Sequence, residues 1–178
     1  MPPKLRPIFL VGMMGVGKST VGPVLANRLA RGFVDTDATV EAAAGRSIAE
    51  IFTRDGESEF RRLEVEAIEE ASLLGAVVAL GGGAISQPGM AERLTSHGTV
   101  VWLRAEPWVL LERIGDVTSR PLLAGLEPAD QLETLGRLLE ERREHYFQAQ
   151  IAVDADVEAE EVADRIVAAM VEFDSKDH

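Results

Sequence analysis

An octapeptide near the start of the chain limits the possible folds more than any other feature. It runs from Gly12 to Ser19 and reads Gly-Met-Met-Gly-Val-Gly-Lys-Ser, which matches the pattern G-x-x-x-x-G-K-[ST]. The apolar run Pro7–Val11 precedes it, and a helical pattern follows over Lys18–Ala30. Glycines let successive backbone N–H groups turn toward an anion, and the positive end of the helix points at the same place. The sequence therefore predicts a strand, a phosphate-binding loop and a helix, in that order.

The loop predicts a nucleoside triphosphate, which we expect to be ATP. Lys18 supplies a mobile charge for the β- and γ-phosphates, and Ser19 offers a hydroxyl to Mg²⁺. The loop alone does not separate a kinase from an ATPase or a GTPase. The N-K-x-D tetrapeptide of guanine-reading proteins is absent, because the only asparagine, Asn27, is followed by arginine. The residues expected to bind ATP here are Gly12, Gly15, Val16, Gly17, Lys18, Ser19 and Thr20.

Apolar runs alternate with amphipathic stretches along the whole chain, which is typical of an α/β fold. Strands separated by helices give right-handed crossovers, and hence a parallel sheet with helices on both faces. We expect one kinase domain over residues 1–178. The expected strands are Pro7–Val11, Phe33–Asp35, Ala76–Leu80, Thr99–Leu103 and Ile151–Val153. After the first helix, the expected helices are Ala38–Ala44, Ser47–Thr53, Glu57–Leu74, Met90–Ser96, Glu106–Ile114, Pro128–Gln148 and Glu158–Phe173.

Composition excludes several other classes of function. The formal net charge is −12, so the chain lacks the basic face of a nucleic-acid-binding protein. There are no cysteines, which excludes disulfides and thiolate metal sites. No apolar run approaches the ~20 residues of a membrane span. We therefore expect a cytoplasmic protein without a nucleic-acid or membrane partner.

Two carboxylates follow the second expected strand, in the sequence Asp35-Thr36-Asp37. If the extended backbone continued through them, both would point to one face beside the phosphate-binding loop. One would then serve Mg²⁺, directly or through water, and the other would accept the proton of an attacking hydroxyl. The alternative is that the acids cap the next helix, with Asp37 at its start, and the two interpretations are compatible.

Five further motifs follow the loop in order, and together with it they resemble the shikimate kinase family. They are Asp35-Thr36-Asp37, Phe60-Arg61-Arg62, Gly81-Gly82-Gly83-Ala84, Arg120-Pro121-Leu122-Leu123, and Arg142 with Tyr146. The loop is generic, but the ordered set is specific and covers nearly the whole chain. The resemblance implies a P-loop kinase fold with five parallel strands in the order 2-3-1-4-5. It also implies ATP, Mg²⁺, a monomeric state, and phosphorylation of the 3-hydroxyl of shikimate.

The resemblance also implies a role for each matching residue. Asp37 binds the shikimate hydroxyls and is the candidate base, within a shikimate-binding region at about 37–62. Lys18 and Arg120 complete the catalytic set, and Arg120, on a mobile lid at about 115–125, also binds the ATP phosphates. Asp35 and Ser19 serve Mg²⁺. The remaining implied contacts are Arg61, Arg142, Gly82 and Gly83 to shikimate, and Arg113 to adenine, near a loop at Asp154–Asp156.

The chemistry of the residue types agrees with these roles, although each has an alternative. The planar fork of arginine binds a carboxylate with two hydrogen bonds, and glycine lets a ligand approach the backbone closely. Arg61 could instead be a solvated partner of Glu57, Glu64 or Glu66 on its helix, and Glu57 is the candidate that would orient it. Arg142 and Arg143 are adjacent, and the spacing to Tyr146 favours Arg142.

Two other functions remain open at this point. Another P-loop kinase for a small metabolite, such as a gluconate kinase, would share the loop and the fold, although the Asp-Thr-Asp, Phe-Arg-Arg and triple-glycine motifs argue against it. A regulatory protein that binds a nucleotide without catalysis would also share the fold. No expected catalytic position is substituted, so the sequence favours an enzyme.

Overall fold

The computed structural model describes residues 5–176, in which five parallel strands form one sheet with the order β2-β3-β1-β4-β5. This confirms the predicted fold class and strand order. Because the chain crosses from one side of β1 to the other, the carboxyl ends of β1 and its neighbours form the edge where ligands bind in such sheets. The strands are β1 Ile8–Val11, β2 Phe33–Asp35, β3 Val77–Ala79, β4 Thr99–Arg104 and β5 Ile151–Asp154.

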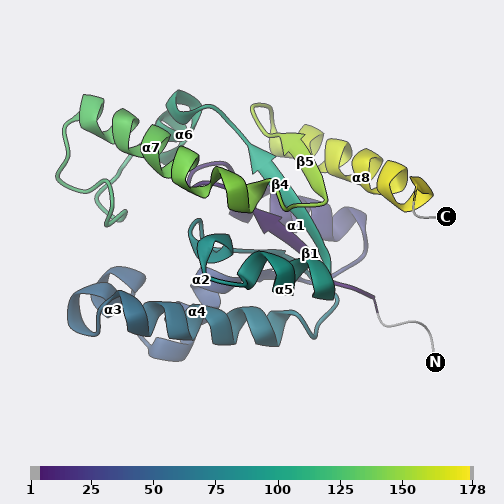
Figure 1. Cartoon of the computed structure of the whole chain (residues 1–178), viewed down its shortest axis with the longest axis horizontal. Coiled ribbons are helices and arrows are strands. Elements are labelled where there is room, and N and C mark those ends of the chain that lie inside the picture. The colour runs from purple at the N-terminus through teal and green to yellow at the C-terminus, as the bar shows by residue number, and fades with distance from the viewer. Residues whose placement is uncertain (1–4, 177–178) are drawn as a thin grey trace.

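Helices cover both faces of the sheet. Helices α1 and α8 contact each other and the strands on one face, whereas α5 and α7 each contact the short 3-10 helix η1 on the other face (Figure 1). The helices are α1 Lys18–Arg28, α2 Thr36–Ala44, α3 Ile48–Arg54, α4 Glu57–Ala71, η1 Ala84–Ser86, α5 Met90–His97, α6 Pro107–Ile114, α7 Pro128–Tyr146 and α8 Ala159–Lys176.

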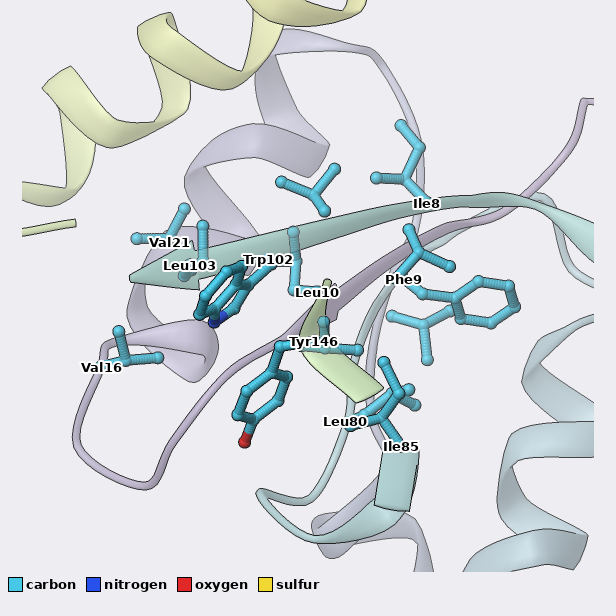
Figure 2. Packing of buried hydrophobic residues seen from close by; sticks show 14 of the residues in the cluster. Ile8, Phe9, Leu10, Val16, Val21, Leu80, Ile85, Trp102, Leu103 and Tyr146 are labelled. Atoms are coloured by element: carbon cyan, nitrogen blue, oxygen red, sulfur yellow. The ribbon is translucent and has the colours of Figure 1, made fainter. Parts of the chain in front are cut away.

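The central strands are apolar because both of their faces are covered. All four residues of β1 are buried, as are the three of β3, which is the pattern of a parallel sheet between two helical layers. Figure 2 shows Ile8, Phe9 and Leu10 of β1 among the side chains of this main core. The rigid sheet fixes the positions of the loops that leave its carboxyl edge.

A second, smaller apolar cluster holds α2, α3 and α4 together beyond β2. It consists of Val40, Ile51, Phe60 and Ala67, and the ring of Phe52 packs against that of Phe60 in a tilted arrangement, at 4.9 Å between centroids. In Figure 1 these three helices lie at the lower left, and the loop that joins α6 to α7 projects on the same side. Within residues 5–176, no helix is both long and apolar enough to cross a membrane.

Candidate active site

The glycines of the phosphate-binding loop are needed for both backbone conformation and packing. Gly15 and Gly17 have positive φ angles of 79° and 103°, which residues with a Cβ rarely adopt. A Cβ on Gly12 would lie 2.6 Å from the Leu103 carbonyl oxygen, and one on Gly15 would lie 2.8 Å from that of Leu110. The loop therefore sits directly against β4 and α6, and only this sequence of glycines allows that contact.

Lys18 is buried inside the loop. Its Nζ donates hydrogen bonds to the carbonyl oxygens of Gly12 at 2.6 Å and Met13 at 3.0 Å. Burial lowers the pKa of Lys18 to about 8, and the nearby carboxylate of Asp37 partly opposes this. An anionic ligand would stabilise this buried cation, because the negative charge of a polyphosphate offsets the free-energy cost of burying the ammonium group.

Asp35 joins the loop to α2 through both of its oxygens. Its Oδ2 accepts a hydrogen bond from the Ser19 hydroxyl at 2.6 Å, and its Oδ1 accepts from the backbone N–H groups of Asp37 and Ala38. Asp35 is thus the N-cap of α2, and the helix begins at Thr36. The condition of extended backbone through both acids is not met, because the cap turns the chain into a helix immediately after Asp35. The structure shows the alternative, a helix cap, and both acids still line the same cavities.

The Ser19 and Asp35 pair fits Mg²⁺. A hydroxyl and a carboxylate are hard oxygen donors, and Mg²⁺ at phosphates takes few protein ligands because it keeps several waters. The hydrogen bond between them points the Ser19 proton at Asp35, which leaves the hydroxyl lone pairs free. No cluster of three or more His, Cys, Asp or Glu suited to a metal occurs among residues 5–176. A Mg²⁺ ion at this pair would take its other ligands from phosphate oxygens and water.

Asp37 lies in the first turn of α2, between two connected cavities. One cavity, of about 460 Å³, is lined by the phosphate-binding loop, Arg113 and the residues that follow β5. The other, of about 610 Å³, is lined by α2, α3, α4 and the triple glycine. The residues that line both are Met14, Ser19, Asp35, Asp37, Gly82 and Arg120.

The carboxyl group of Asp37 is placed to accept a proton. Burial raises its pKa, and the charge of Asp35 raises it further, while Lys18 and Arg120 oppose the shift. Its Oδ1 is buried and has no hydrogen-bond partner among the described residues. An unpaired buried carboxylate oxygen at the junction of two cavities favours a bound hydroxyl group there.

Arg61 reaches the second cavity from α4, supported mainly by a residue that the sequence did not single out. Its guanidinium donates to Glu64 at 2.7 Å, and more weakly to Glu57 at 3.4 Å. Both glutamates were among the expected partners, and the structure shows both pairs, of which the one with Glu64 is shorter. Glu64 is fully buried, and burial raises the pKa of its carboxyl group against the effect of Arg61. Only its position three residues after Arg61 could have indicated this role.

Arg142 reaches the same cavity from α7. It is 9% exposed, and its guanidinium donates to the Gly82 carbonyl oxygen at 3.1 Å. No carboxylate forms an ion pair with it among residues 5–176, so its charge is available to an anion. Arg143, the alternative, is half exposed and pairs with Glu140 at 3.4 Å. The structure therefore brings Arg142, rather than Arg143, to the cavity.

The triple glycine after β3 makes room for the protein's own charged side chains. A Cβ on Gly81 would lie 2.4 Å from Glu64 Oε1 and 2.9 Å from Asp37 Oδ1. A Cβ on Gly83 would lie 2.8 Å from the Arg61 guanidinium. We expected these glycines to admit a ligand, and Gly82 and Gly83 do line the second cavity. Their other effect is to let two acids and an arginine converge.

Arg113 and Arg120 complete the loop side of the site. Arg113 donates to the carbonyl oxygens of Val16, Ala155 and Val157, so it ties the phosphate-binding loop to the segment after β5. This segment includes the predicted Asp154–Asp156 region. Arg120 is exposed on the loop between α6 and α7 and lines both cavities. Gly12 differs from the other predicted residues, because it accepts the Lys18 hydrogen bond and does not line either cavity.

Comparison with known proteins agrees with this geometry. The family model for shikimate kinase matches residues 14–171. The shikimate kinase of Caldanaerobacter subterraneus subsp. tengcongensis is 40% identical over 171 residues, which cover 95% of this chain and 98% of that protein. The structure of a shikimate kinase from Acinetobacter baumannii in complex with shikimate matches 94% of both chains at 35% identity and a TM-score of 0.88.

A gluconokinase structure from Sinorhizobium meliloti 1021 also matches, at 21% identity and a TM-score of 0.60, and shares the fold alone. The assignment of the chain to a family therefore depends on the family model and on the relatives of higher identity. Because that model spans most of the sequence and the matched relatives cover nearly all of it, this chain belongs to the shikimate kinase family.

Proposed function

We propose that this chain transfers the γ-phosphate of ATP to the 3-hydroxyl of shikimate, with Asp37 as the base. The observation that carries the proposal is the position of Asp37, between a cavity built on the phosphate-binding loop and a cavity containing two guanidinium groups. In-line transfer needs the acceptor hydroxyl beside the γ-phosphate and opposite the leaving oxygen, with the base within hydrogen-bond reach of that hydroxyl. The family membership of the chain supports the identity of both substrates.

The second cavity suits an acceptor that carries both a carboxylate and hydroxyl groups. Arg61 and Arg142 come from different helices and present guanidinium groups, whose planar forks bind carboxylates with two hydrogen bonds. The unpaired Oδ1 of Asp37 accepts a hydrogen bond from a hydroxyl group. An acid with a raised pKa is a better proton acceptor than an ordinary aspartate, because the charged form is less stabilised before the reaction.

Charge in the first cavity suits the polyphosphate. Lys18 adds a cation at the loop, Arg120 approaches from the segment at 115–125, and Arg113 borders the adenine side. Bound Mg²⁺ would neutralise charge on the phosphate oxygens, with the Ser19 hydroxyl as ligand and Asp35 acting through water. We assign residues 115–125 as the lid, whose closure reduces the transfer of phosphate to water. The described chain would then act as a single monomeric kinase domain.

The test is a measurement of ADP release with shikimate, with gluconate and without an acceptor. We expect fast turnover with shikimate alone. Similar rates with gluconate would refute the assigned acceptor, and similar rates without an acceptor would indicate an ATPase. Gluconate is included because a gluconokinase shares the fold.

The role of Asp37 is tested in the same assay with Asp37→Asn, which keeps the shape and removes the base. We expect a loss of about 100-fold or more in kcat, while ATP binding persists. Asp130→Asn is the matched control, because Asp130 is an exposed acid in the first turn of α7. Retention of more than a tenth of the activity in Asp37→Asn would contradict a role as base.

A further inference from the structure

Tyr146, at the end of α7, is buried against the sheet but uses its hydroxyl group at the site. Its side chain is 0% exposed, and its ring stacks on Trp102 of β4 at 5.4 Å between centroids and 12° between planes. Figure 2 shows the two rings side by side, with the Tyr146 hydroxyl at the end away from Trp102. That hydroxyl donates a hydrogen bond to the Gly82 carbonyl oxygen at 2.9 Å. The stacking thus fixes the direction in which the hydroxyl points.

The Gly82 carbonyl has a second donor, which is Arg142. Arg142 and Tyr146 are four residues apart on α7, so their side chains lie on one face of the helix. Both donate to the same oxygen, at 3.1 Å and 2.9 Å. Gly82 itself lines both cavities. A single carbonyl group therefore connects α7 to the junction of the two cavities.

The direction of this carbonyl controls the next amide group. In a planar trans peptide, the N–H of Gly83 points opposite to the C=O of Gly82. The C=O points to α7, so the N–H points away from α7. The Gly83 N–H has no acceptor among the described residues, and Gly83 lines the second cavity. Glycines do not hold a peptide plane by themselves, because their backbone is the least restricted.

We propose that Tyr146 is a positioning residue, which holds the Gly82–Gly83 peptide so that the Gly83 N–H faces the carboxylate of the acceptor. This rests on the proposed function, since it says which residue orients the Gly83 contact to the acceptor. Tyr146 also keeps the Gly82 carbonyl paired when Arg142 turns its guanidinium to that carboxylate. Without Tyr146, the movement of Arg142 would leave a part-buried carbonyl oxygen without a donor from the protein, which is unfavourable.

Tyr146→Phe tests the contribution of the hydroxyl group alone, because phenylalanine keeps the ring that stacks on Trp102. Loss of one hydrogen bond of about 1 kcal/mol corresponds to a rise of roughly fivefold in the KM for shikimate. We expect the KM for ATP and kcat to stay within about twofold of the wild-type values, because the hydroxyl touches neither ATP nor the reacting atoms. Ser72→Ala is the control, since Ser72 also donates to a backbone carbonyl, at 2.7 Å, but at the end of α4.

A second measurement follows the peptide directly. In the NMR spectrum of the protein without ligands, we expect the Gly83 amide resonance to shift in Tyr146→Phe and to stay in place in Ser72→Ala. An unchanged KM for shikimate, or equal increases in both KM values, would overturn the positioning role, as would an unshifted Gly83 resonance. The wild-type protein tests the proposed function separately. If it did not turn over shikimate, that function would be refuted, whatever the result for Tyr146→Phe.

Discussion

Glu64 has no exposed side-chain surface, and it accepts a hydrogen bond from Arg61 at 2.7 Å. The same oxygen, Oε2, accepts from the Gln87 side chain at 2.7 Å. The other oxygen, Oε1, has no partner among the described residues. Glu64 therefore holds the Arg61 guanidinium at the second cavity, which both residues line.

Arg61 and its neighbour Arg62 allow a matched test of the second cavity. Arg61→Ala should raise the KM for shikimate by about 100-fold, because a charged hydrogen bond to the acceptor contributes about 1.5–3 kcal/mol. The KM for ATP should change by less than threefold. Arg62→Ala should leave both values unchanged, since Arg62 is exposed and pairs with Glu59 and Glu66. Equal losses of affinity for both substrates in Arg61→Ala would point to a structural role.

Glu64→Gln tests the support of Arg61 separately. The amide oxygen can still accept a hydrogen bond from Arg61, but the negative charge is lost. We expect a smaller rise in the KM for shikimate than in Arg61→Ala, about tenfold, with kcat nearly unchanged. Steady-state kinetics in shikimate checks this. A variant with the wild-type KM would show that the buried charge of Glu64 does not hold Arg61.

Gly81→Ala should damage the site and the fold together. Its Cβ would lie 2.4 Å from Glu64 Oε1 and 2.9 Å from Asp37 Oδ1, so both acids would have to move. Overpacking of this kind costs about 1–3 kcal/mol, which lowers Tm by roughly 2–4 °C for each kcal/mol in a chain of this size. We expect a large fall in kcat/KM for shikimate in the same assay.

Gly136→Ala is the control for that substitution. Gly136 lies inside α7, and nothing lies within 4 Å of a Cβ built there. Because alanine favours helices over glycine by about 1 kcal/mol, the control should raise Tm and keep full activity. If Gly81→Ala had the Tm and the kcat/KM for shikimate of the wild type, the close approach of Glu64 and Asp37 to Gly81 would be refuted.

The strands and the phosphate-binding loop were predictable because each is indicated by a short, continuous stretch of sequence. The apolar residues of β1 and β3 are buried on both faces, and a run of such residues before a glycine-rich loop indicates a strand in any context. The order of the strands in the sheet is not local, and it came from the resemblance to the shikimate kinase family. The helix η1 was missed because Ala84–Ser86 is too short to show a helical period.

The site was less predictable where it depends on tertiary burial. On a charged helix, an acid three residues after an arginine is usually a solvated partner, so Glu64 gave no distinctive signal. Its importance comes from burial under Gly81, which lies in another part of the sequence. The start of α2 was also misjudged, because Asp35 ends a strand and caps a helix at once. The motifs located the parts of the site, but not the contacts between them.

The single tyrosine of the chain gives a direct test of burial by titration. Burial raises the pKa of Tyr146 to about 12 from its usual value of 10.0. The stabilisation linked to this shift is fully present below pH 10.0, and it is lost as the pH rises through about 12. Absorbance at the phenolate band should therefore show no transition near pH 10 while the far-UV circular dichroism stays native. A midpoint near 10 in the folded protein would contradict the burial of the Tyr146 hydroxyl group.

The central claim is that an acceptor hydroxyl and the ATP phosphates meet at Asp37, and the product of a single turnover tests it most directly. Excess enzyme is mixed with ATP and shikimate, and the product is examined by proton–phosphorus correlation NMR. The account predicts a phosphate monoester coupled to the proton on carbon 3 of shikimate, formed by the wild type and not by Asp37→Asn. Inorganic phosphate as the only product, or the same ester formed at equal rate by Asp37→Asn, would contradict it.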